Sequence, residues 1–211
     1  MELKIPKPLI KVTGDITLSP WPMFVQYKPY HYKIGGELVD LIVNTVQPGD
    51  IVLRRYTRYL NTVFTPGYWG HASLYASNNR IIHATSKGVN PEHIRTFCRT
   101  DSLCIRRINC LEPEIVVERA IDFAEKIVGK EYDFGFVIGD DKYSCAEVVN
   151  TCYKPLFAND YEKVYGKISI TRKEGIKFSQ WVITPGGLYR SKAADTILEI
   201  RKGKIIELDE L

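Results

Sequence analysis

The segment from His71 to Thr85, HASLYASNNRIIHAT, constrains the fold more than any other part of the sequence. Two short apolar runs lie on either side of Asn78-Asn79, and asparagine is typical of turns between strands. The segment therefore predicts an antiparallel β-hairpin. Such a hairpin would bring His71 and His83 into one neighbourhood, either as two parts of a site or as two ordinary strand residues.

The neighbouring segments predict that this hairpin belongs to an α+β fold. In GGELVDLIVNTVQ the apolar residues recur at helical spacing, so a helix should end at about Gln47. The run PGDIVL predicts a turn at Pro48-Gly49 followed by a strand, and LCIRRINC predicts a further strand. The middle of the chain should therefore form a small antiparallel sheet.

The two ends of the chain lead to a prediction of domain organisation. PEIVVERAIDFAEKIVGK predicts a second helix that stops at Gly129, and the tail predicts a terminal hairpin around Lys202-Gly203. Residues 1–33, rich in proline and aromatic residues, predict an extended N-terminal arm packed on the core. Residues 34–211 should then form a single domain.

Composition argues against several functions. The chain carries 29 Lys and Arg against 25 Asp and Glu, a net charge of +4 without a long basic run, so no nucleic-acid partner is implied. No segment reaches roughly 18 consecutive apolar residues, and the sequence shows no signal peptide, so we expect no integral membrane segment. The five cysteines include no C-x-x-C pair, which favours a reducing, cytoplasmic compartment. The oligomeric state stays open.

Cys145 is the candidate nucleophile. YSCAEVVNTCYKPLF predicts a short buried helix that begins at Cys145, with Ser144 as its N-cap. The N–H groups and partial positive charge of a helix start stabilise a thiolate, and the N–H of Cys145 could also donate to an oxyanion. An isolated cysteine among apolar residues is more often a small buried hydrophobe, and this interpretation stays open.

His71 is the candidate general base, because acyl transfer by a thiol needs a group that takes the proton and returns it to the leaving group. It lies at the start of the first hairpin strand, beside Gly70, which would leave room for a substrate next to the ring. His83, on the second strand, could reach the His71 ring and orient it. The alternative for His83 is a half-buried strand residue.

Four separated motifs, PGDIVL, WGHASLYASNNRIIHAT, GKEYDFGF and YSCAEVV, resemble the circularly permuted branch of the NlpC/P60 papain-like superfamily over about residues 47–190. The nearest likeness is to the YaeF/YiiX permuted amidases, with lecithin:retinol acyltransferase as a more distant relative. The order His, His, Cys is the one expected after permutation. The resemblance implies a permuted papain-like α+β fold, in which a barrel-like antiparallel sheet packs against the helix that bears the cysteine.

Position by position, the resemblance implies catalytic roles for Cys145 as nucleophile, His71 as general base and His83 as the polar residue that orients it. YiiX-like members often have a carboxylate at the position of His83, whereas the acyltransferase relatives have histidine. Tyr132 matches a tyrosine whose hydroxyl can assist the oxyanion hole, although a packed aromatic residue is an equal alternative. The resemblance implies structural roles for Asp50 and Glu147.

Together these features predict a cysteine hydrolase that cleaves an amide bond in a peptide, a cell-wall fragment or an amino-acid conjugate, without a cofactor or metal. The first alternative is a thioesterase or acyltransferase acting on a lipid-like acyl substrate, favoured by His83 and by the aromatic segment FTPGYWG. The second is a non-catalytic binding module on the same fold. A zinc site is a further rival, but its candidate ligands match no zinc spacing: His71, His83, His93, Cys98, Cys104 and Cys110.

Overall fold

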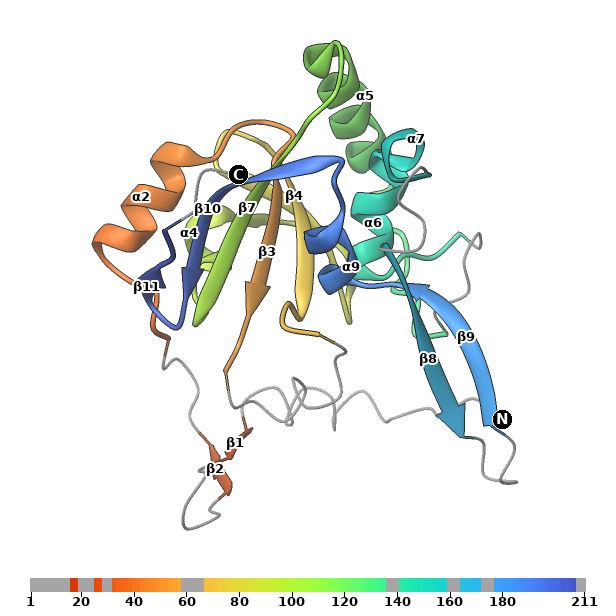
Figure 1. Ribbon diagram of the computed structural model, residues 1–211, viewed down its shortest axis with the longest axis horizontal. Coiled ribbons are helices and arrows are strands. Elements are labelled where there is room, and N and C mark those ends of the chain that lie inside the picture. Colours follow the sequence, from red (N-terminus) through yellow and green to blue (C-terminus); the bar gives the residue numbers. More distant parts are fainter. Residues whose placement is uncertain are drawn as a thin grey trace.

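A seven-stranded antiparallel sheet forms the centre of the computed structural model, which describes residues 16–18, 25–27, 32–57, 67–135, 141–158, 164–171 and 177–207 (Figure 1). The strand order is β11-β10-β7-β3-β4-β5-β6. The strands span Ile51–Arg55 (β3), His71–Ser77 (β4), Arg80–Thr85 (β5), Gly88–His93 (β6), Ser102–Ile108 (β7), Ala194–Arg201 (β10) and Lys204–Ile205 (β11). The predicted α+β class and antiparallel sheet are confirmed, but the sheet is open and does not close into a barrel.

The predicted hairpin of residues 71–85 is confirmed as β4 and β5. Asn78 and Asn79 both have positive φ, 49° and 60°, the combination that a two-residue turn needs to match the twist of its strands. The register pairs Leu74 with Ile82, so residues of odd number in β4 and β5 share one face of the sheet. His71 and His83 therefore project from the same face.

Helices cover the sheet on both sides. One side packs on α5 (Pro113–Lys126) and α6 (Cys145–Cys152), where Leu53, Ala72 and Leu74 meet the helices in one apolar cluster. The other side packs near α2 (Glu37–Thr45) and α4 (Ile94–Phe97) in a second cluster. Two shorter helices, α7 (Lys154–Phe157) and α9 (Pro185–Arg190), complete the described helices. Each face of the sheet is thus buried, as a layered domain requires.

The turn before β3 confirms the structural role predicted for Asp50. Its carboxylate is buried and accepts hydrogen bonds from Arg107 (2.8 Å to each oxygen) and from the Gln47 N–H (2.7 Å). Gly49 has φ +87°, and a Cβ atom there would lie 2.5 Å from a Val117 methyl group. The helix α2 ends at Thr45, two residues before the predicted end, because Val46 is already extended.

Two further sheets have two strands each and are separate from the main sheet. One pairs β1 (Ile16–Leu18) with β2 (Val25–Tyr27), and the other pairs β8 (Tyr165–Thr171) with β9 (Lys177–Ile183) (Figure 1). The predicted arm 1–33 falls mostly outside the described residues, so its packing on the core, and the single domain 34–211, stay predictions. The terminal hairpin is confirmed as β10 and β11.

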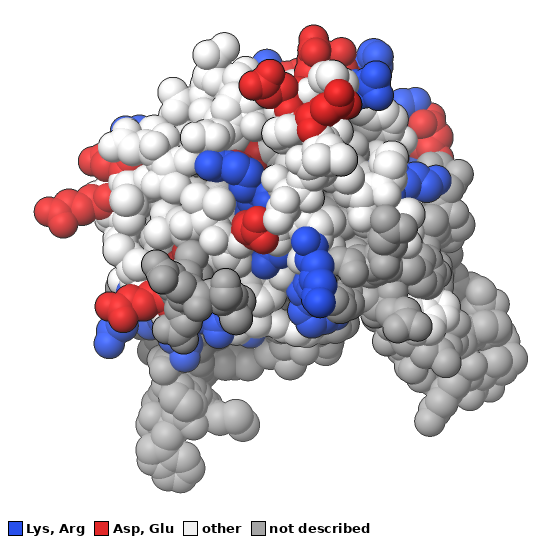
Figure 2. Space-filling view, turned by 45° about the horizontal axis from the view of Figure 1, so that its top comes forward, with Lys and Arg blue, Asp and Glu red and all other residues white. Residues whose placement is uncertain are grey.

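No helix in the described ranges is long and apolar enough to cross a membrane. On the face drawn in Figure 2, the described acidic and basic side chains are interspersed and form no unbroken basic stripe. This distribution agrees with the absence of a long basic run in the sequence.

Candidate active site

The start of α6 holds Cys145 in a fixed position. Ser144 is the N-cap: its hydroxyl accepts a hydrogen bond from the Glu147 N–H (3.4 Å), and the Glu147 carboxylate accepts one from the Ser144 N–H (2.8 Å). This reciprocal capping box satisfies two backbone donors that a helix start leaves open. The predicted N-cap is confirmed, and so is the structural role of Glu147.

The sulfur of Cys145 lies next to the strand that carries His71. Burial raises the pKa of the Cys145 thiol, and this effect outweighs the backbone hydrogen bonds from Ala72 and Ala146 and the charge of Arg54, which all lower the pKa. Ala72 directly follows His71 in β4, so the thiol contacts the backbone of the residue next to the first histidine. The backbone donors of the helix start lower the pKa of the thiol as predicted, but burial of the sulfur has the larger effect.

The two hairpin histidines form a hydrogen-bonded pair. The Nε2 atom of His71 lies 2.9 Å from the Nδ1 atom of His83, and the rings meet edge to face with centroids 5.0 Å apart. Burial and the charge of Arg54 hold the pKa of His71 well below its ordinary value, and the same two effects lower the pKa of His83 to about 3. Both imidazoles are therefore neutral near pH 7.

Tyr132 lies close to the sulfur, after the end of α5. Burial raises the pKa of its hydroxyl well above the ordinary value, and the nearby Cys145 and Glu147 add to this effect. The ring also packs against Phe134, with centroids 4.8 Å apart. The hydroxyl stays protonated and is able to donate a hydrogen bond, as an oxyanion-hole residue must.

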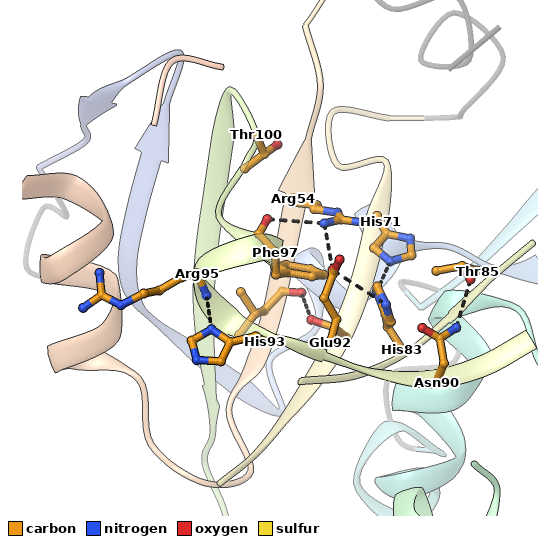
Figure 3. Close-up of polar contacts among 12 residues, drawn as sticks. Arg54, His71, His83, Thr85, Asn90, Glu92, His93, Arg95, Phe97 and Thr100 are labelled. Atoms are coloured by element: carbon orange, nitrogen blue, oxygen red, sulfur yellow. Dashed lines mark hydrogen bonds and ion pairs between the residues drawn. The ribbon is translucent and has the colours of Figure 1, made fainter. Parts of the chain in front are cut away.

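Arg54 and Glu92 were not recognised in the sequence, and the structure brings them to the histidine pair (Figure 3). Arg54 pairs with His71 in the β3–β4 register. Its Nη1 atom lies 3.4 Å from Glu92 Oε2 and donates to the Phe97 carbonyl oxygen (3.3 Å), and the guanidinium lies over the Phe97 ring at 4.0 Å. The same carboxylate oxygen of Glu92 is 3.8 Å from His83 Nε2.

Asn90 adds an acceptor beside His83, its partner in the β5–β6 register. The amide nitrogen of Asn90 donates to the Thr85 hydroxyl (2.9 Å) and to the Gly88 carbonyl (2.7 Å), so both of its N–H groups are used. The amide oxygen is left for His83, and this contact slightly offsets the lowering of the pKa of His83.

Gly70 directly precedes His71 in the chain, at the start of β4. Its N–H donates to the Arg54 carbonyl (3.2 Å), and a Cβ atom built on Gly70 would meet no described atom within 4 Å. Among the described residues there is therefore space for a side chain at Gly70.

The described residues hold no group of three or more His, Cys, Asp or Glu side chains that could bind a metal ion. His93 caps α4, where its Nδ1 atom accepts a hydrogen bond from the Arg95 N–H (3.2 Å). Cys104 is buried in the core of the sheet, and burial raises the pKa of Cys98 to about 12. These residues serve packing and capping in the structure.

Two of three comparisons with known proteins found a match. The family model described as permuted papain-like amidase enzyme, YaeF/YiiX, C92 family, matches residues 45–198. A crystal structure of the metalloprotein yiiX from Escherichia coli O157:H7 superposes with a TM-score of 0.56 at 19% identity, covering 74% of this chain and 99% of that one. At this identity the superposition supports the fold alone, and no curated protein matches the sequence. Since the family model spans most of the chain, the protein belongs to the YaeF/YiiX (C92) family of permuted papain-like amidases.

Proposed function

We propose that the protein is a cysteine amidase that cleaves an amide bond in a peptide, a cell-wall peptide or an amino-acid conjugate through an acyl-enzyme on Cys145. The observation that carries the proposal is the placement of a capped helix start against β4, so that the Cys145 sulfur faces the backbone of the residue after His71. In the proposed reaction this helix start supplies the nucleophile and an oxyanion donor, and we assign the base to His71.

In the proposed reaction the resting thiol is protonated, because burial raises its pKa. The neutral imidazole of His71 takes the thiol proton as the sulfur attacks the carbonyl carbon, and then returns it to the leaving amine. The Nε2 atom of His71 is occupied by His83, so Nδ1 is the nitrogen left for the thiol. Water then hydrolyses the thioester by the reverse sequence of proton transfers.

The oxyanion that forms on the carbonyl oxygen needs donors on the side of the helix start. The backbone N–H of Cys145 lies in the first turn of α6, where it has no partner within the helix. The protonated hydroxyl of Tyr132 is a second donor close to the sulfur. We assign both to the oxyanion hole.

A lipid-like acyl substrate is less well supported. Two aromatic residues that could have lined an apolar groove are used in packing: Trp69 is buried in the core, and the Tyr68 ring packs against the guanidinium groups of Arg55 (4.8 Å) and Arg201 (4.6 Å). Phe64 and the rest of the segment before Gly67 lie outside the described residues. Tyr68 and Trp69 therefore give the lipid alternative no support.

The proposal is tested by alkylation with iodoacetamide, followed peptide by peptide with mass spectrometry because the chain has five cysteines. His71→Ala should slow alkylation of Cys145 at pH 7 and lower turnover of aminoacyl and peptidyl anilides by about 10²–10⁴-fold. Cys145→Ala should abolish turnover. Matched controls are His93→Ala, at the cap of α4, and Cys152→Ala, at the other end of α6.

Two outcomes would contradict the proposal. An unchanged alkylation rate in His71→Ala would show that His71 does not act as the base for Cys145. Turnover that survives in Cys145→Ala would show that Cys145 is not the nucleophile. A panel that also contains acyl esters of increasing chain length separates the substrate classes: faster turnover of long-chain esters than of any anilide would favour the lipid alternative.

A further inference from the structure

The carboxylate of Glu92 lies beside His83, near the ring nitrogen that does not contact His71. We propose that Glu92, held by Arg54, is a positioning residue that adds to the Asn90 amide oxygen in setting which nitrogen of His83 carries the proton, and through it which nitrogen of His71 is free to act as the base. This inference rests on the proposed function. Figure 3 shows the Glu92 side chain between Arg54 and His83, with contacts to both.

The hydrogen bond between the two imidazoles contains a single proton, so it allows two arrangements. If His71 Nε2 donates to His83 Nδ1, then His71 Nδ1 carries a lone pair that can accept the thiol proton, and His83 carries its own proton on Nε2. If His83 Nδ1 donates instead, His71 carries its proton on Nδ1 and cannot act as a base there. Only the first arrangement is productive.

Glu92 favours the productive arrangement through its charge. Its Oε2 atom faces His83 Nε2 at 3.8 Å, a distance too long for a hydrogen bond but short for an electrostatic contact. An N–H group on Nε2 points its positive end at the carboxylate, whereas a lone pair there would be repelled. Because His83 is only 2% exposed, water screens this preference weakly.

Burial, together with the charge of Arg54, keeps the pair neutral while Glu92 orients it. A carboxylate alone would favour an imidazolium on His83, which has no lone pair to accept from His71. The guanidinium of Arg54 contacts the same carboxylate oxygen at 3.4 Å. It is fixed over the Phe97 ring, and that ring packs against both imidazoles, with centroids 5.9 Å from His71 and 5.6 Å from His83.

The test reads the tautomers directly. In protein labelled with ¹⁵N-histidine, ring nitrogen chemical shifts distinguish a nitrogen that carries a proton from one that does not. We expect both His71 and His83 to carry the proton on Nε2 in the wild type. Glu92→Gln should give a mixture of tautomers and slow Cys145 alkylation by iodoacetamide at pH 7 roughly 10-fold, a part of the ~10²–10⁴ that a positioned base contributes. Glu92→Asp should restore part of the rate.

The control is Glu125→Gln. Glu125 lies on α5 and forms a separate ion pair with Arg80 of β5, at 3.0 Å. Both readouts should be unchanged in this variant. A proton on Nδ1 of His83 in the wild type, or unchanged tautomers and alkylation in Glu92→Gln, would overturn the inference. A different result, turnover that survives in Cys145→Ala, would contradict the proposed function. The two failures can be told apart because the tautomer measurement does not depend on turnover.

Discussion

Two ends of the paired strands β3 and β4 carry buried charged groups, and they differ in how those groups are satisfied. At the Asp50 end, comprising Gly49, Asp50 and Arg107, the carboxylate accepts hydrogen bonds of 2.7–2.8 Å. At the His71 end, comprising Arg54, Gly70, His71, His83 and Glu92, the contacts of Arg54 are 3.3 and 3.4 Å, and its buried Nε atom has no hydrogen-bond partner among the described residues.

The two ends differ in which groups their charges act on: Asp50 acts on Arg107 and Tyr153, whereas Arg54 acts on the residues of the candidate site. The bonds of Asp50 are short and complete, so the turn before β3 has a single well-determined arrangement. The field of Arg54 instead reaches both histidines and Cys145, and it lowers the pKa of all three. Incomplete satisfaction of buried polar groups is typical of functional sites, where local stability is given up for chemistry.

The largest expected effect lies at the Asp50 end and concerns stability. Asp50→Ala removes the bonds to Arg107 and Gln47 and should lower the free energy of unfolding by about 3 kcal/mol, at the low end for a buried pair, since the Arg107 side chain is already 31% exposed. Urea denaturation measures the loss. The alkylation rate of Cys145 in the folded variant should stay unchanged. Slower alkylation of Cys145 with little loss of stability would contradict this prediction, because Asp50 would then act on the candidate site.

The next effect lies at the His71 end and concerns pH. The pKa of His83 is about 3 in the folded protein against 6.5 ordinarily, so between these values the unfolded chain binds more protons. Stability is therefore complete above pH 6.5 and falls as the pH decreases toward 3, with a slope that approaches ~1.4 kcal/mol per pH unit for this group. Thermal unfolding from pH 7 to pH 5 measures the slope.

His83→Gln should reduce this slope by the share of His83, while His71, whose pKa is also lowered, continues to take up a proton on unfolding. His93→Gln is the control, since His93 is an exposed capping residue outside the pair. Equal slopes in the wild type and His83→Gln would mean that burial of His83 does not hold it neutral.

Local patterns in the sequence were enough to predict the parts of the site that depend on local structure. The Asn78-Asn79 turn places the two histidines on one face, and Ser144 with Glu147 three residues later is a capping-box pattern that starts a helix at Cys145. The family resemblance then linked the hairpin to the helix. These features depend on neighbours within a few residues, which is why they are visible in the sequence.

The parts that could not be predicted depend on register and burial. Arg54 meets His71 through the β3–β4 register and Glu92 reaches His83 from β6, and no local pattern specifies either pairing. In IVLRRY, Arg54 reads as a solvated residue at a strand end, yet only 10% of its side chain is exposed. The raised pKa of the Cys145 thiol likewise depends on how deeply the sulfur is buried, which no local pattern specifies.

Gly49 and Gly70, the glycines of the two ends, differ in how much an added side chain should cost. Gly49 has φ +87° and its Cβ would clash with Val117, so Gly49→Ala should cost about 1–3 kcal/mol from the backbone conformation alone. Gly70 has open space and no positive φ, so Gly70→Val should change the free energy of unfolding by no more than about 0.5 kcal/mol.

Gly70→Val should nevertheless lower kcat/KM for anilide substrates about 10-fold if the space beside His71 receives the substrate, since two methyl groups would then occupy part of it. Gly35→Val is the matched control: Gly35 also has no atom within 4 Å of a built Cβ and no positive φ, but it lies before α2, away from the histidines. Unchanged turnover in Gly70→Val, with urea unfolding also unchanged, would place the substrate on another side of His71. A loss of turnover in Gly70→Val alone would mean that the open space at the His71 end, in contrast to the filled space at Gly49, is part of the substrate path.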